Sequence, residues 1–261
     1  MRILISLAFI LFTTSSFAIT FEGKFIQGSF ILGKTEPGFQ VFIDKKKVKV
    51  TSDGFFVFGL GRDRKNDVVI TINKEKIVKK VFKREYKIQR IDGLEEKKVT
   101  PPEEVYERIK RENKWIGEAR SIDSDLIFFT KKFQIPIENA IITGVYGSQR
   151  ILNGKSKWPH YGLDFAADEG TKIKAMLDGI VTLAESDLFY TGGTLIFDHG
   201  HGISTLYMHM KKILVKKGQK VKQGDIIGTV GKTGRATGAH LDVRLNWFQT
   251  RLDPATALDI K

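Results

Sequence analysis

The chain of 261 residues contains no cysteine. We therefore expect no disulfide framework, no cysteine nucleophile, no thiolate metal ligand and no lipid anchor on a cysteine. Long hydrophobic runs are also missing. The apolar stretch from Ile3 to Phe12 spans about ten residues, whereas a membrane-spanning helix needs about 20. We expect a mature protein without a transmembrane segment.

The short apolar stretch follows Met1 and Arg2 and leads to Ser16-Phe17-Ala18, a small-x-small pattern. A basic start, a short apolar centre and small residues at a cleavage point are typical of a secretory signal peptide. We predict a cleaved signal peptide over residues 1–18. The mature protein would then be exported, to the periplasm or outside the cell.

Acidic residues are in the minority, since the formal net charge is +13. The excess lies mainly in residues 19–100, which carry 19 basic and 11 acidic side chains, whereas residues 133–261 carry 16 and 12. A basic exported protein could bind anionic envelope polymers, acidic lipid headgroups or nucleic acid, or it could simply present a solvated surface. Charge alone does not choose among these interpretations.

The first domain, residues 19–100, shows short β-like runs separated by turn residues such as Pro37-Gly38. The runs lie at residues 24–30, 40–44, 47–50, 54–58 and 67–72. This pattern predicts a small β-sandwich. The domain has no His, Ser or carboxylate groups at catalytic spacing, so we interpret it as a binding or positioning module.

Residues 101–132 are interpreted as a helical linker. Pro102 precedes Glu103 and Glu104, a pattern that favours helix initiation. We predict one helix over about residues 102–120 that acts as a spacer or packing strut. The linker carries seven basic and seven acidic side chains, and this balance argues against binding of nucleic acid.

Residues 133–261 return to β-like runs, most of them separated by glycine. These runs lie at residues 179–184, 194–198, 204–210, 226–230 and 240–245. We predict an antiparallel β-sheet domain with one face left open as a groove. The protein as a whole is therefore expected to be mainly β.

All five histidines lie in this last domain, between residues 160 and 240. His160 and Asp164 are four residues apart, where a loop running into a strand can direct both at one ion. His240 and Asp242 are two residues apart, so on a strand their side chains project from the same face. The clustering of these residue types indicates a metal site.

Residues 205–210 alternate, and the same period predicts two faces for this strand. Thr205, Tyr207 and His209 would share the open face. Leu206, Met208 and Met210 would face the core.

Zinc takes imidazole nitrogen and carboxylate oxygen, and a catalytic zinc site keeps one position for water. His160, Asp164 and Asp242 would supply three ligands for Zn²⁺, which would activate the water for attack on a peptide carbonyl. His209 and His240 would remain, one to accept the proton and the other to stabilise the oxyanion.

Asp242 and the two remaining histidines, His199 and His201, also have a simpler structural interpretation. Asp242 could form an ion pair with Arg244 or Arg235 instead of binding a metal. His199 and His201, on either side of Gly200, are interpreted as hairpin turn residues.

Four segments together resemble a known family. They are His160-Tyr161-Gly162-Leu163-Asp164-Phe165, Phe197-Asp198-His199-Gly200, Tyr207-Met208-His209-Met210, and Gly234 to Asp242. In order and spacing they resemble the lysostaphin-type (LytM-like) zinc metalloendopeptidases over roughly residues 138–256.

The resemblance implies an antiparallel β-fold with a groove, a bound zinc ion, and hydrolysis of peptide cross-links in bacterial cell-wall peptidoglycan. The peptide stems of peptidoglycan would then be the partner. It also implies that His160 and Asp164 are metal ligands and that His209 and His240 are the catalytic histidines.

One position departs from the family pattern. The last motif is usually H-x-H, with its second histidine on the metal, whereas this chain has Asp242. Carboxylate oxygen is an acceptable zinc ligand, but two carboxylates would neutralise the ion and weaken it as a Lewis acid. Two hypotheses follow: an active hydrolase, or a degenerate domain that binds peptidoglycan or activates another wall hydrolase.

Two other classes find less support. Residues 221–228 resemble the hairpin of biotinyl and lipoyl carriers, but the flanking signature of a modified lysine is missing. Gly231-Lys232-Thr233 resembles part of a phosphate-binding loop, but Ile226 stands where that motif requires glycine.

Overall fold

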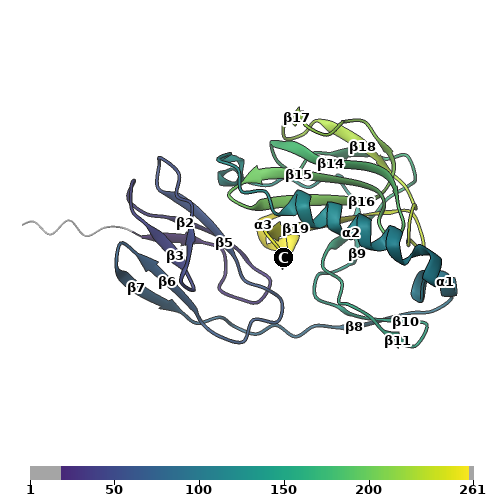
Figure 1. Cartoon of the computed structure of the whole chain (residues 1–261), viewed down its shortest axis with the longest axis horizontal. Coiled ribbons are helices and arrows are strands. Elements are labelled where there is room, and N and C mark those ends of the chain that lie inside the picture. The colour runs from purple at the N-terminus through teal and green to yellow at the C-terminus, as the bar shows by residue number, and fades with distance from the viewer. Residues whose placement is uncertain (1–18, 259–261) are drawn as a thin grey trace, which may run out of the picture.

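The computed structural model describes residues 19–258, apart from the side chain of Lys98. The predicted signal peptide, residues 1–18, lies outside the described residues. Within the described part, no helix combines the length and the apolar character that a membrane crossing requires. Figure 1 shows two lobes along the long axis, with the N-terminal strands in one and the green to yellow strands of the C-terminal half in the other.

The N-terminal lobe is built from two antiparallel sheets, in line with the predicted β-sandwich. One sheet has the order β1-β2-β5, with β1 (Thr20–Glu22), β2 (Phe30–Lys34) and β5 (Phe55–Gly59). The other has the order β4-β3-β6-β7, with β3 (Val41–Ile43), β4 (Lys46–Val48), β6 (Val68–Ile72) and β7 (Glu75–Lys79). Ile31, Phe56 and Ile70 are fully buried and belong to the core.

The core of the sandwich continues into the C-terminal lobe. Phe30 packs edge to face on Phe133, with ring centroids 5.7 Å apart. Gly59 lets the side chain of Leu252 approach so closely that an added Cβ would stand 2.5 Å from it. Phe30, Phe133 and Leu252 belong to one cluster of buried apolar side chains that spans both lobes. The two lobes therefore share a hydrophobic core.

A small sheet also ties the two halves of the chain together. In it β8 (Ile88–Ile91) pairs in parallel with β10 (Gln149–Leu152), which pairs with β11 (Lys155–Ser156). A short helix, α1 (Glu96–Val99), follows β8. The end of the first 100 residues is thus hydrogen-bonded to the C-terminal half.

The predicted linker helix is present. A 3₁₀ turn, η1 (Glu103–Val105), leads into α2 (Tyr106–Arg120), and a second, η2 (Phe128–Thr130), follows. Ala119 on α2 packs with Leu206 and Ile196 of the large sheet. The helix crosses in front of that sheet in Figure 1 and covers part of one face.

The C-terminal lobe contains a 10-stranded antiparallel sheet whose main path is β17-β14-β15-β16-β19-β12-β9. Its strands are β9 (Ile141–Gly144), β12 (Leu163–Ala166), β13 (Lys172–Lys174), β14 (Gly179–Leu188), β15 (Gly192–Gly200), β16 (Ile203–Ile213), β17 (Lys220–Val221), β18 (Ile226–Val230), β19 (His240–Trp247) and β20 (Thr250–Leu252). The final helix is α3 (Pro254–Leu258). The predicted mainly β fold class is confirmed.

The predicted division of β16 into an open and a core face is wrong. Tyr207 and Met210 both lie in the shared core, whereas Leu206 packs with α2 on the opposite face. The pairing with β15 shifts between Tyr207 and Met210, and His209 has a φ of 63°. This bulge breaks the period of two. It moves His209 away from the Tyr207 face.

Candidate metal and catalytic site

His160 lies in the loop before β12, and backbone hydrogen bonds fix its position. Its N–H donates to the carbonyl of Ser148 (2.8 Å), and its own carbonyl accepts from the N–H of Gly147 (2.7 Å). The ring atom Nδ1 lies 3.3 Å from the carbonyl oxygen of Val145. Since a carbonyl only accepts, we assign the proton to Nδ1, which leaves Nε2 with a lone pair.

Two neighbouring strands bring carboxylates to that nitrogen. Asp164 on β12 is the register partner of Asp242 on β19, so both side chains project from one face. Nε2 of His160 lies 3.0 Å from Oδ1 of Asp164 and 3.4 Å from Oδ2 of Asp242. One ligand atom from each residue lies within 4.8 Å of the others. The structure thus brings together all three predicted metal ligands.

Two of these buried atoms, Nε2 of His160 and Oδ1 of Asp164, have no hydrogen-bond partner among the described residues. Nε2 and Oδ1 lie 3.0 Å apart, so the lone pair and the carboxylate would repel each other unless a proton or a cation lay between them. Buried polar atoms without a partner are costly. A divalent metal ion between them would satisfy both, and one imidazole with two carboxylates is a donor set that zinc accepts.

Two glycines make room for the carboxylates. Gly144 on β9 faces Asp164, and an added Cβ would stand 2.0 Å from its Oδ2. At Gly162 an added Cβ would stand 2.0 Å from Oδ1 of Asp242. Any larger residue at either position would displace a carboxylate from the cluster.

Each carboxylate is also paired with an arginine. Nη2 of Arg150, on β10, lies 3.2 Å from Oδ2 of Asp164, and Nη2 of Arg244 lies 3.1 Å from Oδ2 of Asp242. The second pair was considered from the sequence, because Asp242 and Arg244 are two residues apart on a strand. The first was missed, because no local pattern connects a hairpin residue with a strand 14 positions later.

These charges set the protonation of the cluster. Burial alone would raise the pKa of the Asp242 carboxyl, but the charges of Arg244 and His160 hold it well below its usual range. Burial acts to lower the pKa of His160, and the charges of Asp242 and Asp164 raise it above its ordinary value. Asp242 is therefore ionised at neutral pH, which is the form that binds metal.

His209 and His240 stand next to each other, with ring centroids 4.8 Å apart. Nδ1 of His209 lies 2.8 Å from the carbonyl oxygen of Thr233, and Nδ1 of His240 lies 2.9 Å from that of Gly238. Burial lowers the pKa of His209 to about 4, against the opposing charge of Asp242. The His209 ring is thus neutral at pH 7 and able to accept a proton.

The interpretation of the other two histidines is half right. His201 lies in the turn after β15, as predicted, and its ring packs 4.7 Å from that of Phe129. His199, however, is a fully buried residue of β15 and not a turn residue. Its Nδ1 lies 2.6 Å from the carbonyl oxygen of Asp178 and its Nε2 2.8 Å from Oγ1 of Thr205. Because both ring nitrogens have hydrogen-bond partners, the His199 side chain can be buried among apolar core residues.

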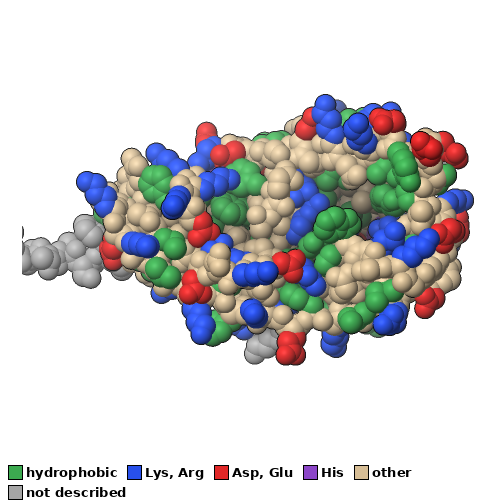
Figure 2. All heavy atoms as spheres, turned by 60° about the horizontal axis from the view of Figure 1, so that its bottom comes forward, with side chains coloured by type: hydrophobic (Ala, Val, Ile, Leu, Met, Phe, Trp, Pro, Cys, Tyr) green, Lys and Arg blue, Asp and Glu red, His purple; other side chains and the backbone are tan. Residues whose placement is uncertain are grey.

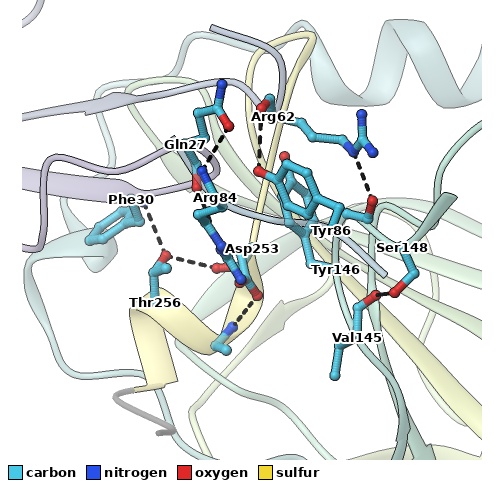
Figure 3. A network of polar contacts seen from close by, with 12 residues as sticks. Gln27, Phe30, Arg62, Arg84, Tyr86, Val145, Tyr146, Ser148, Asp253 and Thr256 are labelled. Carbon is cyan, nitrogen blue, oxygen red and sulfur yellow. Dashed lines mark hydrogen bonds and ion pairs between the residues drawn. The ribbon is translucent and has the colours of Figure 1, made fainter. Parts of the chain in front are cut away.

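The loop that holds His160 is itself held by the N-terminal half of the chain (Figure 3). Nε of Arg62 donates to the carbonyl of Gly147 (2.9 Å), and the N–H of Gly147 in turn donates to the carbonyl of His160. The hydroxyl of Tyr86 donates to the carbonyl of Arg62 (3.2 Å). Contacts from the N-terminal lobe therefore reach the loop that orients a candidate ligand.

The candidate site residues are shielded from the surface on the face drawn in Figure 2. Figure 2 shows Lys and Arg side chains scattered over one face and a hollow, bordered by hydrophobic and basic side chains, on the C-terminal side. Among the described residues no histidine shows on this face. This agrees with the burial of His160 (1% exposed) and His209 (8%).

The C-terminal part of the chain is similar to known peptidases. Residues 158–254 match peptidase family M23, a range that contains all five candidate site residues. A peptidoglycan DD-endopeptidase of Vibrio cholerae, ShyA, is 46% identical over 87 residues, which are 33% of this chain and 20% of that protein. A protein of Buchnera aphidicola named as a metalloprotease is 45% identical over 98 residues, 38% of this chain and 26% of that protein.

The chain spans about a fifth to a quarter of the length of these curated relatives. A solved structure matches over a greater extent. The crystal structure of a Pseudomonas aeruginosa protein assigned to peptidase M23 has a TM-score of 0.70 and 27% identity, and the match covers 91% of this chain and 96% of that one. The likeness therefore includes the N-terminal lobe and the linker helix as well as the range matched by the family.

Proposed function

We propose that the chain is a zinc metalloendopeptidase that hydrolyses peptide cross-links of bacterial peptidoglycan, because its residues 158–254 match peptidase family M23. One observation carries the proposal. His160, Asp164 and Asp242 converge from a loop and two strands, and two of their buried atoms have no hydrogen-bond partner in the part of the chain that the structure describes. The substrate class comes from the peptidoglycan DD-endopeptidases among the relatives.

A zinc ion held by these three residues would polarise a peptide carbonyl and supply an activated water. The two neighbouring histidines supply the remaining groups that amide hydrolysis needs. His209 is neutral and can take up a proton, and His240, on the same side of the cluster, can hydrogen-bond the developing oxyanion. The two roles can also be exchanged between them, because their rings are adjacent.

The place of action follows from the substrate. Peptidoglycan lies outside the cytoplasmic membrane, so we propose that residues 1–18 direct export and that the protein acts in the periplasm or outside the cell. Residues 19–100 carry 19 basic against 11 acidic side chains. We propose that this surface binds anionic polymers of the envelope beside the substrate.

A second candidate function is supported by Asp242 itself. With a carboxylate in place of the usual histidine, and with Arg244 paired to it, the domain could bind peptidoglycan or activate another wall hydrolase without cutting. Digestion of purified sacculi separates the two functions. We expect the mature protein to release new peptide termini and His209→Ala to release none.

His201→Gln is the matched control, because His201 lies in a turn outside the cluster and should leave the rate unchanged. Equal product from the wild type and His209→Ala would contradict the catalytic role of His209. Binding of sacculi without any new termini would favour the second candidate.

A further inference from the structure

Both candidate carboxylate ligands face two kinds of partner. Oδ1 of Asp164 faces His160 at 3.0 Å, while its Oδ2 accepts from Arg150 at 3.2 Å. Oδ2 of Asp242 lies 3.4 Å from Nε2 of His160 and 3.1 Å from Nη2 of Arg244. Each ligand carboxylate is therefore shared between the cluster and a guanidinium group.

These two ion pairs are shielded from water. The side chains of Asp164 and Asp242 are 9% and 2% exposed, and those of Arg150 and Arg244 are each 21% exposed. Charge pairs in such surroundings interact much more strongly than pairs on the surface. In formal charge the two arginines cancel the two carboxylates.

We infer that Arg150 and Arg244 are positioning residues that also draw charge from the two carboxylates, so that an ion in this site keeps its Lewis acidity despite Asp242. The inference rests on the proposed function. A guanidinium that holds a carboxylate makes it a weaker donor, just as groups hydrogen-bonded to a metal ligand tune it elsewhere. The Asp242–Arg244 pair is then, in charge, equivalent to the neutral histidine of the usual motif.

The two arginines are themselves held in place. Arg244 projects from the same face of β19 as Asp242, because the two are two residues apart on one strand. Nε of Arg150 donates to Oε1 of Gln89 (3.2 Å), a residue of β8. One of the two arginines is thus oriented by the segment that leads out of the N-terminal lobe.

Arg244→Gln tests the inference through zinc affinity, measured by competition with a chelator. If Arg244 draws charge from Asp242, its loss frees a full carboxylate, and zinc should bind more tightly, by about 10-fold for each pKa unit by which the ion pair lowers the basicity of that carboxylate. If Arg244 only orients Asp242, zinc should bind more weakly, and that result would overturn the inference. Arg64→Gln is the matched control, because Arg64 pairs with Asp44 in the N-terminal lobe and should leave zinc affinity unchanged.

A second measurement uses hydrolysis of sacculi in two backgrounds. Arg244→Gln should slow hydrolysis about 10-fold when Asp242 is present, because the unpaired carboxylate then offsets one of the two charges of the ion. In the Asp242→His background the same change should raise the rate, because the unpaired guanidinium no longer repels the ion. A purely structural role would lower the rate in both backgrounds.

Failure of the proposed function and failure of this inference give different results. A wild type that binds zinc but never cuts sacculi would defeat the proposed function, while the affinity measurement would still decide the role of Arg244. If Arg244→Gln does not fold by circular dichroism, Arg150→Gln provides the same affinity test at Asp164. A weaker zinc affinity in that variant would overturn the inference.

Discussion

Asp164 and Asp242 are register partners on adjacent antiparallel strands, and their carboxylates converge on the same ring nitrogen of His160. A slip of one residue between β12 and β19 would turn one of the two carboxylates toward the core. The geometry of the candidate metal centre is therefore fixed by the pairing of the sheet. Only His160 depends on a loop.

Removal of His160 should abolish metal binding. We expect the mature wild type to carry about one zinc ion per chain and His160→Ala to carry none, since a catalytic zinc site needs three protein ligands. Elemental analysis after dialysis measures this. Zinc at 100 times its Kd should also stabilise the wild type by about 2.7 kcal/mol and leave the variant unchanged. Equal zinc content in both proteins would rule out His160 as a ligand.

Gly162→Ala should weaken the metal site without unfolding the protein. The added methyl group would stand 2.0 Å from Oδ1 of Asp242 and 2.8 Å from the carbonyl oxygen of Val243, so the carboxylate must move. We expect zinc affinity to fall by about 10-fold or more, as measured by chelator competition. Gly117→Ala on α2 is the control, because a Cβ there meets nothing within 4 Å. It should leave zinc affinity unchanged and stabilise the helix by about 0.5–1 kcal/mol.

His199 should make the fold sensitive to acid. Burial lowers its pKa from 6.5 to about 4, against the hydrogen bond to the backbone of Asp178. Between these values the unfolded chain binds a proton that the folded chain does not, so stability is lost as pH falls through this window. His199→Gln should reduce the loss of stability between pH 7 and pH 5 by roughly 2 kcal/mol, as measured by urea unfolding.

Thr205→Val is the control for that experiment. It removes the hydroxyl that meets Nε2 of His199 but keeps the imidazole in its buried position. The variant should be less stable at every pH and should keep the acid sensitivity. If both variants lose the sensitivity equally, a different group is responsible for it.

Arg84→Ala should destabilise both lobes together. Nη1 of Arg84 pairs with Oδ2 of Asp253 at 2.6 Å, and the Asp253 side chain is 4% exposed (Figure 3). Loss of the partner leaves a buried charge uncompensated, which costs about 3–5 kcal/mol. Calorimetry should show one transition at a lower temperature. Lys49→Ala, which breaks a pair with the exposed Asp125, should cost at most about 1 kcal/mol.

The sequence predicted those features that depend on local pattern. Alternation and turn residues indicated the sandwich, and Pro102 with its two following glutamates indicated the helix. The three ligand candidates were also found, since His160 and Asp164 share one motif and Asp242 stands in another. The sandwich and the helix were predicted correctly because each rests on residues that are close together in the chain. The structure brings the three ligand candidates together, and their role as ligands stays a prediction.

Features that depend on contacts between distant segments were not predicted. The period of two misplaced Tyr207 because α2 covers one face of β16 and the shared core covers the other. His209 reached the candidate site only through a bulge with a positive φ. Arg150 was overlooked because its contact with Asp164 depends on the path of the β10 hairpin, and no spacing in the sequence reports that path.

The core that Phe30, Phe133 and Leu252 help to form determines how the chain can be divided. A fragment trimmed to the range matched by the family, residues 158–254, would retain every candidate ligand. It would also lose Arg62 and the carbonyl of Val145, and it would present Leu252 to water. Such a fragment should be prone to aggregation, and its loss of zinc binding would report damaged architecture instead of missing chemistry.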